Sequence, residues 1–217
     1  MDVRGLLIAA AGAVLLAGCA SGGGGHASTD GGHKTTGGSV SSSSGNSPTA
    51  PMTTTLRTFT PYSASGQLTV PVARRVRGHC WETSLAAPAA NDYRCLAANQ
   101  ILDPCFVSPA GHAKHRSSTL ACFTDPWSKA VQLHVRRLPK AHPLTRRPWA
   151  VVLTSGQRCV AVTGTSPFVA GVGLDYWCGG GEAVALRNLH TRHVTALVGH
   201  VRGSTLRHIS VQTIWRG

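Results

Sequence analysis

The stretch GHCWETSLAAPAANDYRCLAANQILDPCF, from Gly78 to Phe106, contains three of the seven cysteines of this 217-residue chain. Cys80 is either a reactive thiol or one half of a disulfide, and the choice bears on both the fold and the presence of a catalytic nucleophile. Because the cellular compartment sets the oxidation state of cysteines, the destination of the chain has to be considered first.

The N-terminus, MDVRGLLIAAAGAVLLAGCA, has the pattern of an export signal. Arg4 precedes an apolar run from Leu6 to Ala17, which is shorter than the roughly 20 residues that a membrane-spanning helix needs. Residues 16–19, Leu-Ala-Gly-Cys, resemble the lipobox of bacterial lipoproteins. The resemblance implies a signal peptide over 1–18, lipid attachment to Cys19, and a membrane-anchored protein at the outer face of the cytoplasmic membrane. An ordinary signal peptide or an uncleaved anchor is the alternative.

Residues 19–55 have the composition of a flexible tether. Gly, Ser and Thr dominate from Ala20 to Thr55, and such a segment cannot bury enough apolar surface to become ordered. A Gly/Ser linker of about 36 residues has an average reach of about 30–36 Å. We interpret His26 and His33 as solvated residues of this linker rather than metal ligands.

Residues 56–217 are expected to form one domain, because the segment is long enough for a single core. Apolar residues alternate with polar ones at Val131, Leu133 and Val135, which is the period of a β-strand. Two further segments are apolar runs around Gly-containing turns and predict β-hairpins. The hairpins are expected over 149–162 and 172–189, and another strand over 207–215.

One short helix is expected over 91–102. Asn91 or Asp92 can cap it, Tyr93 and Leu96 lie near helical spacing, and Asp103-Pro104 would end it. The sequence therefore predicts a mainly β fold: a single antiparallel β sandwich or barrel-like domain with one short helix.

Cys-Trp at residues 80–81 resembles the nucleophile segment of papain-like cysteine proteases. That family has a glutamine six residues before the nucleophile, where this chain has Arg74. Pro88 interrupts the helix that the nucleophile should begin, and His208 lies near the expected distance for the base but has no asparagine after it. The protease interpretation depends on Cys-Trp alone.

A disulfide framework accounts for more of the sequence. With Cys19 taken by lipid, an even number of cysteines is left in an exported chain, which predicts disulfides among Cys80, Cys95, Cys105, Cys122, Cys159 and Cys178. Six cysteines allow 15 pairings, so spacing alone leaves the connectivity open. Local geometry favours the sequential pairs Cys80–Cys95, Cys105–Cys122 and Cys159–Cys178: the last two cysteines lie in predicted strands that can be adjacent, and each of the other pairs is within reach across one local segment. Each pair would close a loop of about 15–20 residues and contribute on the order of 3 kcal/mol. A zinc site competes, but the chain has no Cys-x-x-Cys pair, so no metal or other cofactor is expected.

The cysteine spacing also resembles a known pattern. The stretch 78–106, followed by LACFTDPW, RPWAVVLTSGQRC and LDYWC, is similar to an uncharacterised family of secreted or membrane-tethered actinobacterial domains with the pattern G-x-C-W-x-x-S-x-A-A-P…Y-R-C…D-P-C-F. The match runs from Val76 to Cys178, and Ala89 departs from it, because the family often has a charged or larger residue there. The resemblance implies a folding unit but no reaction or ligand.

The chain is strongly basic, with a formal charge of +13 from 21 basic and 8 acidic residues. Basic residues cluster at 73–79, at 112–116, and above all at 134–149, where prolines keep the segment extended. This last segment predicts a surface for anionic lipid headgroups or phosphate-bearing wall polymers. Its candidate residues are Arg136, Arg137, Lys140, Arg146 and Arg147. Export argues against nucleic acid, and a solvated loop is the alternative.

An envelope hydrolase acting on wall glycan or peptide is the competing hypothesis. Glycan hydrolysis usually takes two carboxylates, but Asp92 is interpreted as a cap, and Asp103 and Asp125 precede prolines in expected turns. The histidine pairs at 190 and 193 and at 112 and 115 have no evident carboxylate partner. Tryptophans could line a sugar groove or fill the core. We therefore expect a non-catalytic binding or structural role and assign no catalytic residue; the oligomeric state stays open.

Overall fold

The computed structural model describes residues 52–109, 118–142 and 144–217. The predicted signal peptide, Cys19, most of the linker and the basic cluster at 112–116 lie outside these described residues. The chain from Pro48 to Gly217 forms one compact unit, and its described part is mainly β, with antiparallel sheets and no helix. The coarse fold expectation is therefore confirmed.

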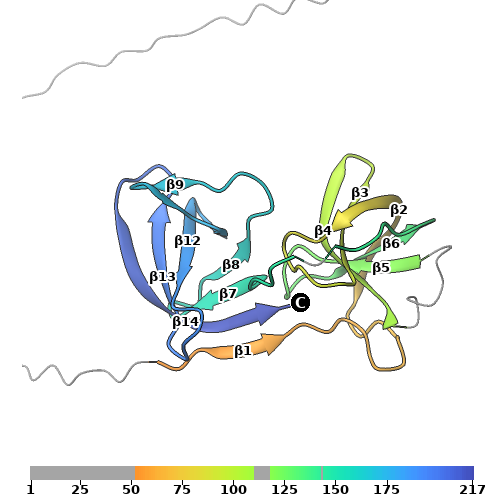
Figure 1. Cartoon of the computed structure of the whole chain (residues 1–217), viewed down its shortest axis with the longest axis horizontal. Coiled ribbons are helices and arrows are strands. Elements are labelled where there is room, and N and C mark those ends of the chain that lie inside the picture. Colours follow the sequence, from red (N-terminus) through yellow and green to blue (C-terminus); the bar gives the residue numbers. More distant parts are fainter. Residues whose placement is uncertain (1–51, 110–117, 143) are drawn as a thin grey trace, which may run out of the picture. The chain divides into compact units, whose positions relative to one another are not determined.

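Five strands form a closed barrel, here called the N-terminal barrel (Figure 1). They are β2 (Val72–Thr83), β3 (Asp92–Ala97), β4 (Gln100–Val107), β5 (Ser118–Cys122) and β6 (Ala130–Val135). Neighbours along the chain pair antiparallel, and β2 pairs with β6 in parallel to close the ring. An odd number of alternating strands leaves the first and last pointing the same way, so this closure has to be parallel.

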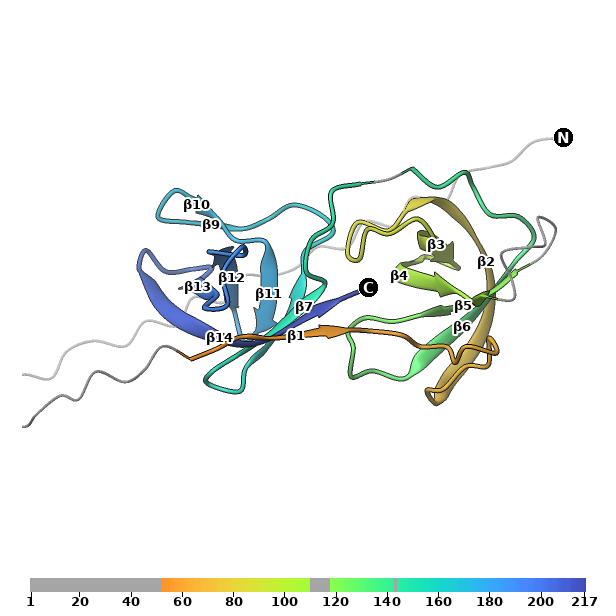
Figure 2. The same cartoon turned by 60° about the horizontal axis from the view of Figure 1, so that its bottom comes forward.

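The remaining long strands form the C-terminal sheet (Figure 2). Its strands are β7 (Ala150–Leu153), β8 (Arg158–Ala161), β11 (Tyr176–Gly179), β12 (Glu182–Arg187), β13 (Thr195–His200) and β14 (Leu206–Arg216). Here the number of alternating strands is even, and β14 closes onto β7 with an antiparallel pair. A small hairpin of β9 (Phe168–Val169) and β10 (Val172–Gly173) lies between β8 and β11 in the chain.

The first strand, β1 (Thr55–Thr58), adds to the end of β14 in parallel. Just before it, the Thr54 amide donates to the Arg192 carbonyl, and the Thr54 hydroxyl donates to the Val211 carbonyl at 2.8 Å. The contacts of the described domain therefore begin slightly before Leu56, inside the segment that composition assigns to the linker.

The strand predictions from alternation and turn residues are confirmed. The expected hairpins are β7–β8 and β11–β12, and the expected single strands are β6 and β14. Gly156 and Gly181 have φ of 82° and 81° in the two hairpin turns, a backbone region that glycine adopts without strain.

The helix predicted over 91–102 is wrong. This segment is a hairpin in which β3 and β4 pair across a two-residue turn at Ala98 and Asn99, with Ala98 at a φ of 52°. Alternate residues of β3 are buried, and Cys95 lies opposite Cys80 of β2. Pairing with strands on both sides of β3 overrides the helical preference of Leu96 and Ala97.

An aromatic cluster joins the two sheets. The Phe59 ring lies 5.5 Å from Phe106, 5.0 Å from Phe123 and 5.0 Å from Trp149, measured between centroids. Phe106 is on β4, Phe123 follows β5, and Trp149 immediately precedes β7 and is fully buried. The Tyr176 hydroxyl of the C-terminal sheet also donates to the carbonyl before Trp149 at 2.9 Å. This packing fastens the N-terminal barrel to the C-terminal sheet.

Candidate functional site

All six cysteines of the described domain are paired in the structure. The pairs are Cys80–Cys95, Cys105–Cys122 and Cys159–Cys178, with Cα atoms 3.9 Å apart in each. The first two pairs join residues that lie directly opposite each other on adjacent antiparallel strands. These are the sequential pairs favoured from the sequence. Because Cys80 is bonded and buried, it has no thiolate for the cysteine-protease mechanism.

A groove of about 840 Å³ is lined by β2 and by the end of β6 with the segment that follows it, and we call it the basic groove. Three of the five predicted polyanion-binding residues line this groove: Arg136, Arg137 and Lys140. They belong to the segment that follows β6. The other wall comes from β2. The ionisable side chains of the groove are Arg77, His79, His134, Arg136, Arg137 and Lys140.

The parallel pairing of β2 with β6 builds this groove. Arg77 lies opposite His134 in the register, and Gly78 lies opposite Val135. Successive residues of a strand face opposite sides, so the burial of Leu133, Val135 and Cys80 turns the alternate residues Arg77, His79 and His134 outward. A Cβ at Gly78 would meet the Leu96 carbonyl, so only glycine fits this point of the strand.

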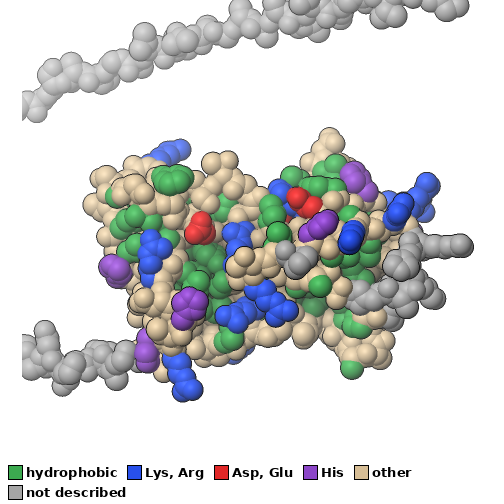
Figure 3. Space-filling model, in the orientation of Figure 1, with side chains coloured by type: hydrophobic (Ala, Val, Ile, Leu, Met, Phe, Trp, Pro, Cys, Tyr) green, Lys and Arg blue, Asp and Glu red, His purple; other side chains and the backbone are tan. Residues whose placement is uncertain are grey.

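The ionisable side chains that line the groove are all basic. Its lining contains no carboxylate, and within the described residues the salt bridges use only Arg94 and Arg207 among the basic side chains. The neighbouring Arg75 donates to the Gln132 amide oxygen at 2.7 Å rather than to an acid. On the face shown in Figure 3, Lys and Arg side chains outnumber the few acidic ones.

The other two predicted residues, Arg146 and Arg147, are not on the basic groove. Arg147 is half-buried and donates to two backbone carbonyls, Leu85 at 2.8 Å and Val162 at 2.9 Å. These contacts connect the segment after β2 to the segment after β8. Arg146 is exposed, and its charge acts on buried Asp92. Arg147 therefore has a structural contact that its position in the sequence does not reveal.

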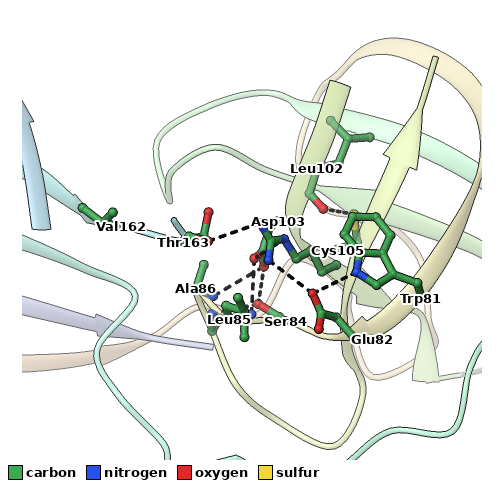
Figure 4. A network of polar contacts seen from close by, with 12 residues as sticks. Trp81, Glu82, Ser84, Leu85, Ala86, Leu102, Asp103, Cys105, Val162 and Thr163 are labelled. Carbon is green, nitrogen blue, oxygen red and sulfur yellow. Dashed lines mark hydrogen bonds and ion pairs between the residues drawn. The ribbon is translucent and has the colours of Figure 1, made fainter. Parts of the chain in front are cut away.

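A second polar cluster surrounds Asp103, whose side chain is only 2% exposed. Its carboxylate accepts hydrogen bonds from the Ser84 hydroxyl at 2.5 Å and from the amides of Leu85 and Ala86 (Figure 4). Burial raises the pKa of Asp103, and these hydrogen bonds together with Arg94 oppose the shift. The carboxylate holds the turn after β2 against β4.

Arg94 completes this cluster. Its guanidinium lies 3.2 Å from the Glu82 carboxylate and 3.7 Å from Asp103, donates to the Thr163 carbonyl, and covers the Trp81 ring. Glu82 and Asp103 are thus held by one cation, and Asp103 is closed to solvent. A glycosidase needs two carboxylates that reach the substrate, and this pair does not offer them.

Asp92, expected as a helix cap, is instead a buried residue at the start of β3. Its Oδ2 atom has no hydrogen-bond partner in the described structure. Burial raises the pKa of Asp92 to about 7; the charge of Asp103 adds to the shift, and Arg146 opposes it. Asp92 therefore combines a strongly raised pKa with a carboxyl oxygen that has no hydrogen-bond partner among the described residues.

The other candidate residues are dispersed. Asp125 accepts from the Trp127 amide at 2.8 Å in the turn between β5 and β6, and Glu182 pairs with Arg207 at 2.9 Å. Hydrogen bonds from Gln157 and Arg207 lower the pKa of Glu182. Among the described residues, no group of three or more His, Cys, Asp and Glu side chains could hold a metal ion. His112 and His115 lie outside these residues.

Comparisons with protein-family models, with curated proteins and with solved structures found no match for this chain. The family resemblance in the cysteine spacing therefore stays a prediction. Within 52–109, 118–142 and 144–217, the structure contains no helix long and apolar enough to cross a membrane.

Proposed function

We propose that this protein is a lipid-anchored protein of the bacterial cell envelope that binds phosphate-bearing ligands through the basic groove, in a non-catalytic role. The observation that carries the proposal is the composition of the groove: three arginines, one lysine and two histidines, with no carboxylate among its lining residues. The lipobox-like sequence at 16–19 and the paired cysteines support an exported chain.

Phosphate oxygens fit this groove chemically. Guanidinium groups present several donors in a planar fork that suits phosphate, and the lysine adds a point charge. Each Lys or Arg close to an anionic membrane contributes about 1 kcal/mol. The four cations of the groove would together contribute about 4 kcal/mol, which corresponds to a factor of about 10³ in binding.

The ligand can be a lipid headgroup or a wall polymer, since both carry phosphate. The test uses a chain starting at Ala20, so that no lipid masks the surface. One arm measures co-sedimentation with phosphatidylcholine vesicles with and without phosphatidylglycerol. The other measures binding of soluble poly(glycerol phosphate). Both interactions should weaken with salt, as the Debye length falls from about 10 Å at 0.1 M to about 3 Å at 1 M.

The decisive variant changes the groove cations to serine: Arg77, Arg136, Arg137 and Lys140. Its matched control removes the same charge from exposed positions elsewhere: Lys129, Arg187, Arg192 and Arg202. The groove variant should lose most of the binding, whereas the control should keep it within a few-fold. Equal loss in both variants would mean that net charge alone attracts the ligand. Retention by the groove variant at low salt, or no binding of either probe by the wild type, would refute the proposal.

A further inference from the structure

Of the four tryptophans outside the buried clusters of the described domain, Trp127 and Trp177 line hollows that the basic groove does not explain. Trp177 of β11 is 41% exposed, and Trp127, in the turn between β5 and β6, is half-buried. By contrast, Trp149 is fully buried in the aromatic cluster. Filling the core therefore accounts for Trp149 but not for Trp177.

Trp177 stands between two hollows. One, of about 420 Å³, is also lined by Asp125, Trp127, Ser128 and Arg158. The other, of about 410 Å³, is mainly apolar and includes Val162 and Pro167. Each volume falls within the range of small-ligand sites, and the shared tryptophan makes the two hollows adjacent. We call Trp177, Trp127, Asp125, Ser128 and Arg158 the tryptophan shelf.

The shelf offers both donors and acceptors beside its rings. The Arg158 guanidinium lies 4.8 Å from the centroid of Trp127 and is exposed. The Asp125 carboxylate accepts hydrogen bonds from the Trp127 amide and the Thr124 hydroxyl, which fix its position in the turn. An aromatic face with a few placed polar groups is the usual composition of a site for a small polar ligand.

A disulfide cross-links the two strands that carry Arg158 and Trp177 of the shelf. Trp177 lies opposite Val160 in the β11–β8 register, and the Cys159–Cys178 disulfide joins the same two strands. Both cysteines pack into the core of the C-terminal sheet, so the alternation of the strands turns Arg158 and Trp177 outward. A site held on cross-linked strands loses little conformational freedom when it binds.

We propose that the tryptophan shelf binds a linear saccharide, with one sugar ring stacked on Trp177 and its neighbour in the adjoining hollow. A sugar ring has an apolar C–H face for the indole and hydroxyl groups that both donate and accept, which matches Asp125, Ser128 and Arg158. A purely apolar occupant would displace water from these polar groups without replacing its hydrogen bonds. The shelf shares no residue with the basic groove, so either proposal can fail without the other.

The test measures binding of soluble oligosaccharides to the chain starting at Ala20, by saturation-transfer NMR and by calorimetry at millimolar ligand. The probes are a β-1,4-linked N-acetylglucosamine oligomer and an α-1,4-linked glucose oligomer. At least one should bind the wild type. Trp177→Ala should weaken that binding at least tenfold, and Arg158→Gln, an exposed change that leaves the core intact, should weaken it several-fold.

Trp81→Ala is the matched control, because Trp81 is 40% exposed but belongs to the N-terminal barrel. It should leave saccharide binding unchanged. A Pro-rich peptide is the rival occupant, since such peptides also dock on aromatic grooves. Binding of the peptide but of neither sugar would overturn the proposal. So would absence of sugar binding, or equal loss in Trp81→Ala and Trp177→Ala when both variants melt like the wild type.

Discussion

Asp92→Asn should remove a large part of the pH dependence of the stability of this domain. Asp92 is 6% exposed, its Oδ2 atom has no partner, and burial raises its pKa from 3.8 to about 7. The native state therefore binds the proton more tightly than the unfolded chain does. The resulting stabilisation is present at low pH and is lost as the pH rises through about 7.

The magnitude follows from the two pKa values. With 3.8 in the unfolded chain and about 7 in the native domain, this carboxyl makes the free energy of unfolding about 2.5 kcal/mol larger at pH 5 than at pH 8. Asparagine has nearly the same shape and no charge to bury. The difference between pH 5 and pH 8 should therefore be about 2.5 kcal/mol smaller in Asp92→Asn than in the wild type.

The assay is urea unfolding with the disulfides intact, followed by tryptophan fluorescence at pH 5 and at pH 8. The comparison between variants cancels the contributions of titrating groups that do not interact with Asp92. Asp175→Asn removes an exposed carboxylate and should keep the wild-type pH dependence. If Asp92→Asn unfolds with the same pH dependence as the wild type, the buried, unpartnered carboxyl is not the cause and the reasoning is wrong.

Three other outcomes are expected. Peptide mapping without reduction should find no free thiol in the domain, and detection of an alkylated cysteine in the folded wild type would contradict the pairing. Replacing Cys159 and Cys178 by alanine should lower the free energy of unfolding by about 3 kcal/mol, because their loop spans 19 residues. Arg147→Ala should destabilise the domain by about 2 kcal/mol through its two lost carbonyl contacts, whereas Arg136→Ala should not, as thermal melting will show. Cys19→Ala should block processing and detergent partitioning, and a lipid-free wild-type N-terminus after residue 19 would exclude the lipobox interpretation.

Local patterns predicted those parts of the fold that depend on neighbouring residues. Alternation at 131–135 predicts β6, and the glycines at 156 and 179–181 predict the two hairpins of the C-terminal sheet. The even number of cysteines after Cys19 predicts disulfides. These signals are short-range, because side-chain alternation and turn geometry are properties of a few consecutive residues.

The hairpin of β3 and β4 shows where local reasoning fails. Its turn, Ala98-Asn99, has no glycine, and the flanking Leu96 and Ala97 favour a helix in isolation. What selects a strand is the pairing of Cys95 with Cys80 and of β3 with two neighbours, and neither is encoded in the period of this segment. The burial of Asp92 follows from the same pairing.

The sequence likewise predicts some features of the basic groove and not others. The basic charge of 134–149 and the shorter cluster at 73–79 are visible in the sequence, but their proximity is not. Closure of the N-terminal barrel places Arg77 and His79 of β2 beside the residues that follow β6. Tertiary packing also places Arg147 away from the basic groove, where its guanidinium donates to two backbone carbonyls.

The sequence by itself determined the β-rich character of the domain, its cysteine inventory and its excess of positive charge, because these follow from composition and from the spacing of adjacent residues. Only the tertiary structure decided which strands meet, and so which charges share a groove and which carboxyl is left without a partner. The physical reason is that strand closure joins residues far apart in the chain, and the pattern of a single strand carries no information about its partner.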